Sequence, residues 1–271
     1  MRPCWIDYLR ASALIPGLVS LCLPLVWANR GAAATNGGPT GLRPIPPAAA
    51  AKPTAAQPGV DPRFPFQQIG PGLFQLGNVT LDKTRRTVAC PATVNQRTGT
   101  VEYAVVTTTG KTHESVFRTE AQPEHVHLAL LLLGAKAAST NVFPADLTLP
   151  PPGQPVTIEV SWSQEGAERR VPIEDFVMTV DNHAALPRGP WIFNGSFVFN
   201  GRFLAQDEGS LVSVHIDPGA LINSPRKGRD NDDLHVVRSE AMPKIDGPLT
   251  VIITLPARPG AAAPAAQSSS P

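Results

Sequence analysis

The fold of this chain is constrained most by a succession of short segments, between about residues 64 and 256, in which apolar and polar residues alternate. In residues 156–162, Val, Ile, Val and Trp alternate with Thr, Glu and Ser, the period of two that a half-buried strand requires. Asn200-Gly201, between two further segments, is a strong signal for a tight hairpin turn. A chain with this pattern must form a sheet that buries one of its faces.

Strands are expected wherever this alternation or an enrichment in β-branched residues occurs. These segments are residues 76–81, 87–94, 101–108, 112–119, 156–162, 169–173, 176–180, 191–199, 202–206, 211–216 and 249–255. We therefore predict a mainly β (α+β) fold, either an antiparallel β sandwich or an open barrel-like domain.

One buried helix is expected among the strands, at about residues 123–134. Pro123 suits the first helical position, Glu124 the first turn, and Gly134 the end of the helix. Val126, Leu130 and Leu133 fall on one apolar stripe, and Leu131 and Leu132 widen it, so the helix should be buried on most sides.

Two passages of the chain resemble each other. Residues 149–158 match residues 242–251 without gaps, at an offset of 93, and both are a proline-rich approach to an amphipathic strand. Farther upstream, each of the two passages is preceded by a strand that begins at a glycine, Gly99 for the first and Gly209 for the second. One interpretation is two related halves, and the other is a chance similarity between two edge strands that begin with proline.

The ends of the chain differ in composition from its middle. Residues 1–28 carry Arg2 and Arg10 before a nearly uninterrupted apolar run, and they end in a small residue, Ala28, the pattern of a cleaved signal peptide. Residues 29–63 and 257–271 are rich in Ala, Pro and other small residues, so we expect a disordered tether and a disordered tail around a single domain at residues 64–256. The protein should be exported, to the periplasm or another extracytoplasmic site, with membrane contact only through an uncleaved signal.

Charge and cysteine content exclude several classes of function. A formal net charge of +1 with 17% charged residues gives no overall signature of nucleic-acid binding. Signal removal leaves Cys90 as the only cysteine, so the mature chain cannot form an internal disulfide, a four-cysteine zinc site or an all-cysteine iron–sulfur cluster. Cys90 is expected to be a small buried strand residue, and no cofactor is predicted.

The segment from Gly110 to Gly134 holds the main candidate site. Glu124 and His127 are three residues apart and share a helix face, the spacing of Glu-x-x-His ligand pairs. They could form a polar or metal site with His113 or Glu114, which as strand neighbours would point to opposite faces. In the alternative interpretation there is no site: Glu124 complements the helix dipole, His125 is solvated, and His127 and His113 are hydrogen-bonded at the edge of the core.

A weaker candidate is the acidic loop with Asp230, Asp232 and Asp233. Clustered carboxylates suit calcium, but the loop lacks the glycine and the distal glutamate of an EF-hand, and a solvated loop is the alternative. No nucleophile elbow, phosphate-binding glycine loop or dinucleotide motif is present in the sequence. The metal, if one binds, cannot be identified from these residues.

Several motifs together resemble the YdjY-domain family of exported bacterial proteins, over roughly residues 73–256. The motifs are Leu81-Asp82-Lys83, Gly99-Thr100-Val101-Glu102-Tyr103, Gly110-Lys111-Thr112-His113-Glu114-Ser115, Pro123 to Leu131 followed by Gly134, Trp191, Asn194-Gly195-Ser196, Gly209, Asp217-Pro218 and Asn231-Asp232-Asp233. The family has no established activity, and the ferredoxin-type names of some members do not suit a chain with one mature cysteine.

Two functional hypotheses follow. The first is an exported binding or structural module of the cell envelope, not an enzyme, whose ligand or protein partner is unknown. The alternative is a metal-dependent hydrolase-like enzyme with its site at the N-terminus of helix 123–134.

Overall fold

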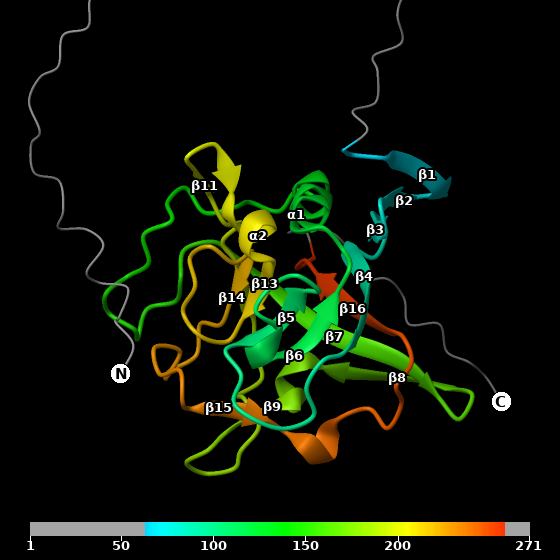
Figure 1. Ribbon diagram of the computed structural model, residues 1–271. Helices are drawn as coiled ribbons and strands as arrows, with labels where there is room; N and C mark the ends of the chain where they lie inside the picture. The colour runs from blue at the N-terminus through cyan, green and yellow to red at the C-terminus, as the bar shows by residue number, and fades with distance from the viewer. Residues whose placement is uncertain (1–62, 258–271) are drawn as a thin grey trace, which may run out of the picture. The chain divides into compact units, whose positions relative to one another are not determined.

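Strands dominate the computed structural model, which describes residues 63–257 (Figure 1). The mainly β prediction is therefore confirmed. The expected signal peptide, and all of the expected tether and tail except Arg63 and Ala257, lie outside the described residues. Within residues 63–257, no helix is long and apolar enough to cross a membrane.

Eight strands close into a barrel. In order around the barrel they are β4 (Thr87–Val94), β16 (Leu249–Thr254), β7 (Gln154–Gln164), β10 (Trp191–Phe193), β14 (Ile222–Asn223), β13 (Ser210–Ser213), β5 (Tyr103–Thr107) and β6 (Ser115–Thr119). The pairing of β4 with β6 completes the ring. Because β5 pairs with β6 and β13 with β14 in parallel, the barrel is mixed rather than purely antiparallel.

Further strands extend the barrel. The strands β1 (Phe66–Gly70), β2 (Leu73–Leu76) and β3 (Val79–Asp82) form a meander that continues from β4, and β8 (Ala167–Pro172) pairs with β7. Two small separate sheets consist of β11 (Val198–Phe199) with β12 (Arg202–Phe203), and of β9 (Val177–Thr179) with β15 (His235–Val237).

In the described part of the chain, the helices are few and short. They are α1 (Pro123–Leu132), α2 (Leu204–Glu208) and the 3-10 turns η2 (Thr112–Glu114), η3 (Ile173–Phe176) and η4 (Ser239–Ala241). The helix α1 packs on β3, β4 and α2 (Figure 1). Its start at Pro123 and its end before Gly134, whose φ of 86° is left-handed, confirm the limits expected from the sequence.

The apolar alternation of the strands fills the core as expected. Val156, Ile158, Val160 and Trp162 on β7 are all buried, and the neighbouring β4 and β16 bury their alternate residues in the same way. Cys90 on β4 is 1% exposed, and burial raises the pKa of its thiol to about 12. It is therefore an unreactive core residue, as predicted.

Several local expectations are wrong. The strand expected at residues 202–206 ends at Phe203, because the helix α2 begins at Leu204. Residues 112–114 form a 3-10 turn instead of the start of a strand, because the apolar residues begin only at Val116. The expected strand 76–81 is broken by a turn at Gly77, whose φ is 58°. The helix is buried on one side only, since Leu131 and Leu132 are 38% and 47% exposed.

The pairing of the strands has twofold symmetry. The symmetry relates four strands of the first half to four of the second: β4 to β10, β5 to β13, β6 to β14 and β7 to β16. When each strand is exchanged with its counterpart, every pairing in the barrel is kept. At the centre of the β7–β16 ladder, Glu159 pairs with Ile252, and these two residues are also equivalent at the offset of 93. Both strands are interior to the sheet, so they are not edge strands, and the pairing is the one that two related halves would give.

Candidate functional site

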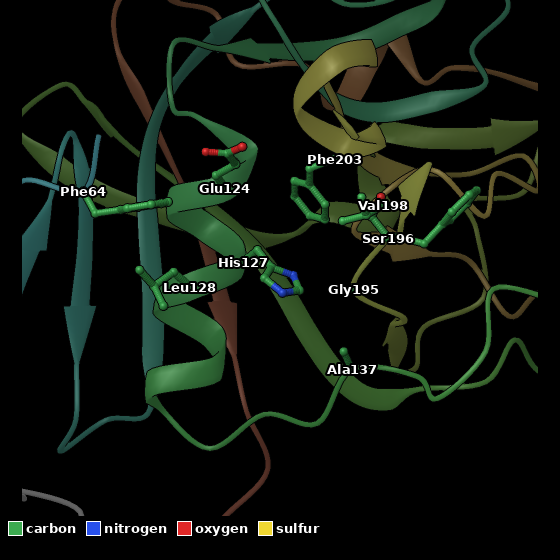
Figure 2. Close-up of a pocket in the computed structure, with 10 residues that line it drawn as sticks. Phe64, Glu124, His127, Leu128, Ala137, Gly195, Ser196, Val198 and Phe203 are labelled. Carbon is green, nitrogen blue, oxygen red and sulfur yellow. The ribbon is translucent and has the colours of Figure 1, made fainter. Parts of the chain in front are cut away.

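A pocket of about 530 Å³ lies between the first half of α1 and the hairpin β11–β12 (Figure 2). Glu124, His127 and Leu128 face it from α1, and the strands and loops opposite supply mainly apolar side chains. The lining residues are Phe64, Glu124, His127, Leu128, Ala137, Gly195, Ser196, Phe197, Val198 and Phe203.

His127 forms part of the aromatic wall of this pocket. Its ring packs against Phe193 and Phe203, with centroid distances of 5.6 Å and 5.1 Å. Burial lowers the pKa of His127, so the imidazole is neutral at pH 7. Its buried Nδ1 has no hydrogen-bond partner within the described residues, in contrast to the hydrogen-bonded histidine of the alternative interpretation.

Glu124 is half-buried in the first turn of α1, one turn before His127. Its backbone N–H donates to Gln206 Oε1 at 3.2 Å, and Gln206 Nε2 donates to Gln122 Oε1 at 3.0 Å, so α2 caps the N-terminus of α1. Among residues 63–257, nothing forms an ion pair or hydrogen bond with the carboxylate of Glu124. The carboxylate is therefore available to a ligand.

The opposite wall depends on two glycines. Gly195 has a φ of 85°, and a Cβ there would lie 2.6 Å from Ala137 Cβ and 3.2 Å from His127 Cε1, so only glycine allows this close approach to α1. The expected Asn200-Gly201 turn is confirmed, with left-handed φ values of 51° and 76°. The hairpin exposes Val198 and Phe199 to solvent beside the pocket.

The four main candidate residues lie at two places. Glu124 and His127 share one face of α1, as the helical spacing predicts, and both line the pocket. His113 and Glu114 lie on η2 at the other end of β6, whose five residues span roughly 16 Å. There His113 Nε2 lies 3.5 Å from Glu114 Oε2, so the two side chains meet instead of pointing to opposite faces.

His125 is buried, and its expected solvation is wrong. Its side chain packs under Gly77, and its Nε2 lies 2.7 Å from the carbonyl oxygen of Arg63. This contact ties the start of the described chain to α1. It also places Phe64, whose ring packs edge-on against His125, at one side of the pocket.

The acidic loop is exposed at Asp230, Asp232 and Asp233. Within the loop, one side-chain hydrogen bond is formed: Asn231 Oδ1 accepts from the Asp233 N–H at 3.0 Å, which is an ordinary turn interaction. Over residues 63–257, no three or more His, Cys, Asp and Glu side chains are placed so that they could hold one metal ion.

A second polar cluster was not expected from the sequence. Lys111 Nζ donates to the hydroxyl of Tyr103 at 2.5 Å, and that hydroxyl donates to Asp217 Oδ2 at 2.9 Å. Lys111 Nζ also lies 3.6 Å from a carboxylate oxygen of Glu208 and 3.8 Å from Asp217. We call Tyr103, Lys111, Glu208 and Asp217 the crossover cluster, because it joins the loops that connect the parallel pairs β5–β6 and β13–β14.

Negative charge predominates around the crossover cluster. Burial, followed by Asp217, raises the pKa of both Tyr103 and Glu208. Burial, followed by Glu114, also raises the pKa of Glu102. The sequence contains no signal for this cluster beyond the presence of Tyr103, Lys111 and Asp217 in family motifs, since its members come from distant segments.

Comparison with known proteins assigns the chain to a family. A family model described as "YdjY domain" matches residues 79–254, from the start of β3 to the end of β16, and so contains the whole barrel with α1 and α2. No curated protein and no solved structure gives a significant match. The family match spans well over half of the sequence, and the chain belongs to the YdjY domain family.

Proposed function

We propose that this YdjY domain is an exported binding module and that the pocket beside α1 binds a small molecule with an apolar body. The observation that carries the proposal is the combination of a volume of about 530 Å³ with a lining that is mostly apolar and contains few polar groups. Small-molecule sites in proteins typically have volumes of roughly 300–1,000 Å³ and this type of lining.

The rigidity of the pocket walls supports binding without a large rearrangement. The helix α1 is packed on β3 and β4 and is capped by Gln206 of α2. Ser196 Oγ donates to the carbonyl oxygen of Gly219 at 2.6 Å and accepts the Ala205 N–H at 3.1 Å, which fixes the loop before the hairpin. A ligand would therefore lose little affinity to the ordering of the site.

Export is the second part of the proposal. It is supported by the basic start, the apolar run and the small residue at position 28. N-terminal sequencing of the mature protein from a cell that exports it should give Asn29 as the first residue. A mature chain that begins at Met1 in the cytoplasm would contradict this part.

The metal-dependent hydrolase is the alternative, and the pocket provides only Glu124 and His127 as ligands for it. A catalytic zinc site usually has three protein ligands. Elemental analysis of protein purified without chelator, beside His127→Ala, separates the hypotheses. Stoichiometric metal in the wild type that is lost in the variant would favour the hydrolase.

The binding proposal is tested with dansylamide, a neutral fluorescent probe. Ala137 is exposed and lines the pocket, so Ala137→Trp should fill it and weaken the binding of dansylamide at least about tenfold. Ala167→Trp is the matched control, since Ala167 is an exposed residue of β8 that does not line the pocket. Equal affinity in both variants would contradict the proposal.

A further inference from the structure

We infer that the pocket beside α1 selects ligands that join an ammonium group to an aromatic or aliphatic body, and that Glu124 determines this selectivity. The inference rests on the proposed function and adds the chemical class of the ligand. Three features of the pocket carry it: its charge, its aromatic side chains and the arrangement of the neighbouring cations.

Among residues 63–257, the wall of the pocket carries a single formal charge, and it is negative. Of the ten lining residues, only Glu124 and His127 are titratable, and burial keeps His127 neutral. A half-buried carboxylate without a partner loses hydration that nothing in the described residues replaces. An ammonium group bound beside it would compensate that loss, whereas an anionic group would be repelled.

The aromatic side chains of the pocket suit the same ligand. Phe64, Phe197 and Phe203 line it, and the face of an aromatic ring attracts a cation. Phe64 already shows this behaviour, because the guanidinium carbon of Arg63 lies 5.7 Å from its ring centroid. Phenylalanine rings combined with one carboxylate bind the apolar body and the ammonium group of one molecule.

The cations on adjacent segments do not line the pocket. Arg202 forms an ion pair with Asp207 at 2.6 Å, and Lys136, next to Ala137, is exposed. Arg63 lies over the ring of Phe64 and is also outside the lining. Glu124 is therefore the charge that a ligand in the pocket would meet.

Three probes with one fluorophore test the selectivity: dansylcadaverine is cationic, dansylamide is neutral and dansylglycine is anionic at pH 7. The full-length mature protein should bind dansylcadaverine about three- to tenfold more tightly than dansylamide, the range of a partly exposed ion pair in an apolar setting. It should bind dansylglycine most weakly. Glu124→Gln should abolish the preference for dansylcadaverine over dansylamide.

Glu168→Gln removes an exposed carboxylate of β8 and is the control for net charge. It should keep the full preference for dansylcadaverine. Binding of dansylamide without any preference for dansylcadaverine, or a preference that survives Glu124→Gln, would contradict the inference and leave the proposed function intact. Loss of the preference in Glu168→Gln as well would also contradict the inference. If none of the three probes bound, both the proposed function and the inference would be overturned.

Discussion

The pocket beside α1 and the crossover cluster are both built from polar and aromatic side chains, but their polar groups differ in one respect. In the crossover cluster, Lys111, Tyr103 and Asp217 satisfy one another at 2.5–2.9 Å. In the pocket, the carboxylate of Glu124 and the Nδ1 of His127 have no partner among the described residues. Satisfied groups hold two loops together, whereas unsatisfied groups around an open volume are free to bind a ligand.

The largest effect is expected where the junction of α2 and β13 touches the end of β5. Gly209 has a φ of 69°, and a Cβ there would clash with Thr107 Oγ1 and lie 2.9 Å from Gly110 Cα, so Gly209→Ala should reduce the free energy of unfolding by about 3 kcal/mol or more. Gly166→Ala is the control, since Gly166 has a similar φ of 79° with nothing within 4 Å. It should cost about 1 kcal/mol. Similar losses for the two variants in urea unfolding would show that the close contact at Gly209 is unimportant.

His235 has an unsatisfied buried nitrogen outside the pocket beside α1. It is 2% exposed, its Nε2 has no partner within residues 63–257, and burial, followed by the positive charges of His215 and Arg226, lowers its pKa to about 4. The unfolded chain therefore binds a proton more readily than the folded one, so stability should be lost as the pH falls from about 6.5 to 4. The loss should be about 2 to 3 kcal/mol.

The control for this pH dependence is His235→Gln, in which that part of the loss should disappear. Glu102 and Glu208, whose pKa values are raised, act in the opposite direction, so the difference between wild type and variant isolates His235. Parallel pH profiles of urea unfolding for the two proteins would contradict the assignment.

Asp217→Asn tests whether the crossover cluster serves stability and not binding: the variant should be less stable but should bind the probe as before. The Asp217 side chain accepts hydrogen bonds from Tyr103 and from the Gly219 N–H, so the loss of its charge should cost about 1 to 2 kcal/mol. The affinity for dansylamide should not change. Asp233→Asn, in the exposed loop, should cost less than about 0.5 kcal/mol. A loss of probe binding in Asp217→Asn at full stability would assign the crossover cluster to the binding site.

The smallest effect on stability is expected in the pocket itself. Glu124→Gln removes a charge that has no partner in the described chain, so the free energy of unfolding should change by less than about 0.5 kcal/mol. A loss of 2 kcal/mol in urea unfolding would mean that Glu124 stabilises α1, and the pocket would then resemble the crossover cluster.

The sequence predicts the parts of the fold that depend on neighbours in the chain. The alternation in β7, the Asn200-Gly201 turn and the limits of α1 are all local patterns, and all are found. Closure of the barrel could not be predicted, because β4 and β6 meet through only two residue pairs. Strands as short as β14, with two residues, have no readable alternation.

In the candidate site, too, the sequence predicts what depends on neighbouring residues and not what depends on distant segments. The spacing of Glu124 and His127 on one helix places both at the pocket. Phe64 and Phe203 reach the pocket from segments far apart in the sequence, and Tyr103 and Asp217 meet across 114 positions, so no local pattern indicates these contacts. The sequence predicts a strand at His113 and Glu114, with the two side chains on opposite faces, whereas the 3-10 turn found there brings them together.

Methyl chemical-shift mapping tests the central claim most directly. The full-length mature protein, labelled at Leu, Val and Ala methyl groups, is titrated with dansylcadaverine. The shifts should concentrate at Leu128, Ala137 and Val198, which line the pocket, and should be absent at Ala167 on β8. Shifts that instead concentrate at Val105, on the strand that carries Tyr103, and at Val214, in the loop that carries Asp217, would contradict a binding site beside α1. Shifts that are absent at saturating probe would contradict it too.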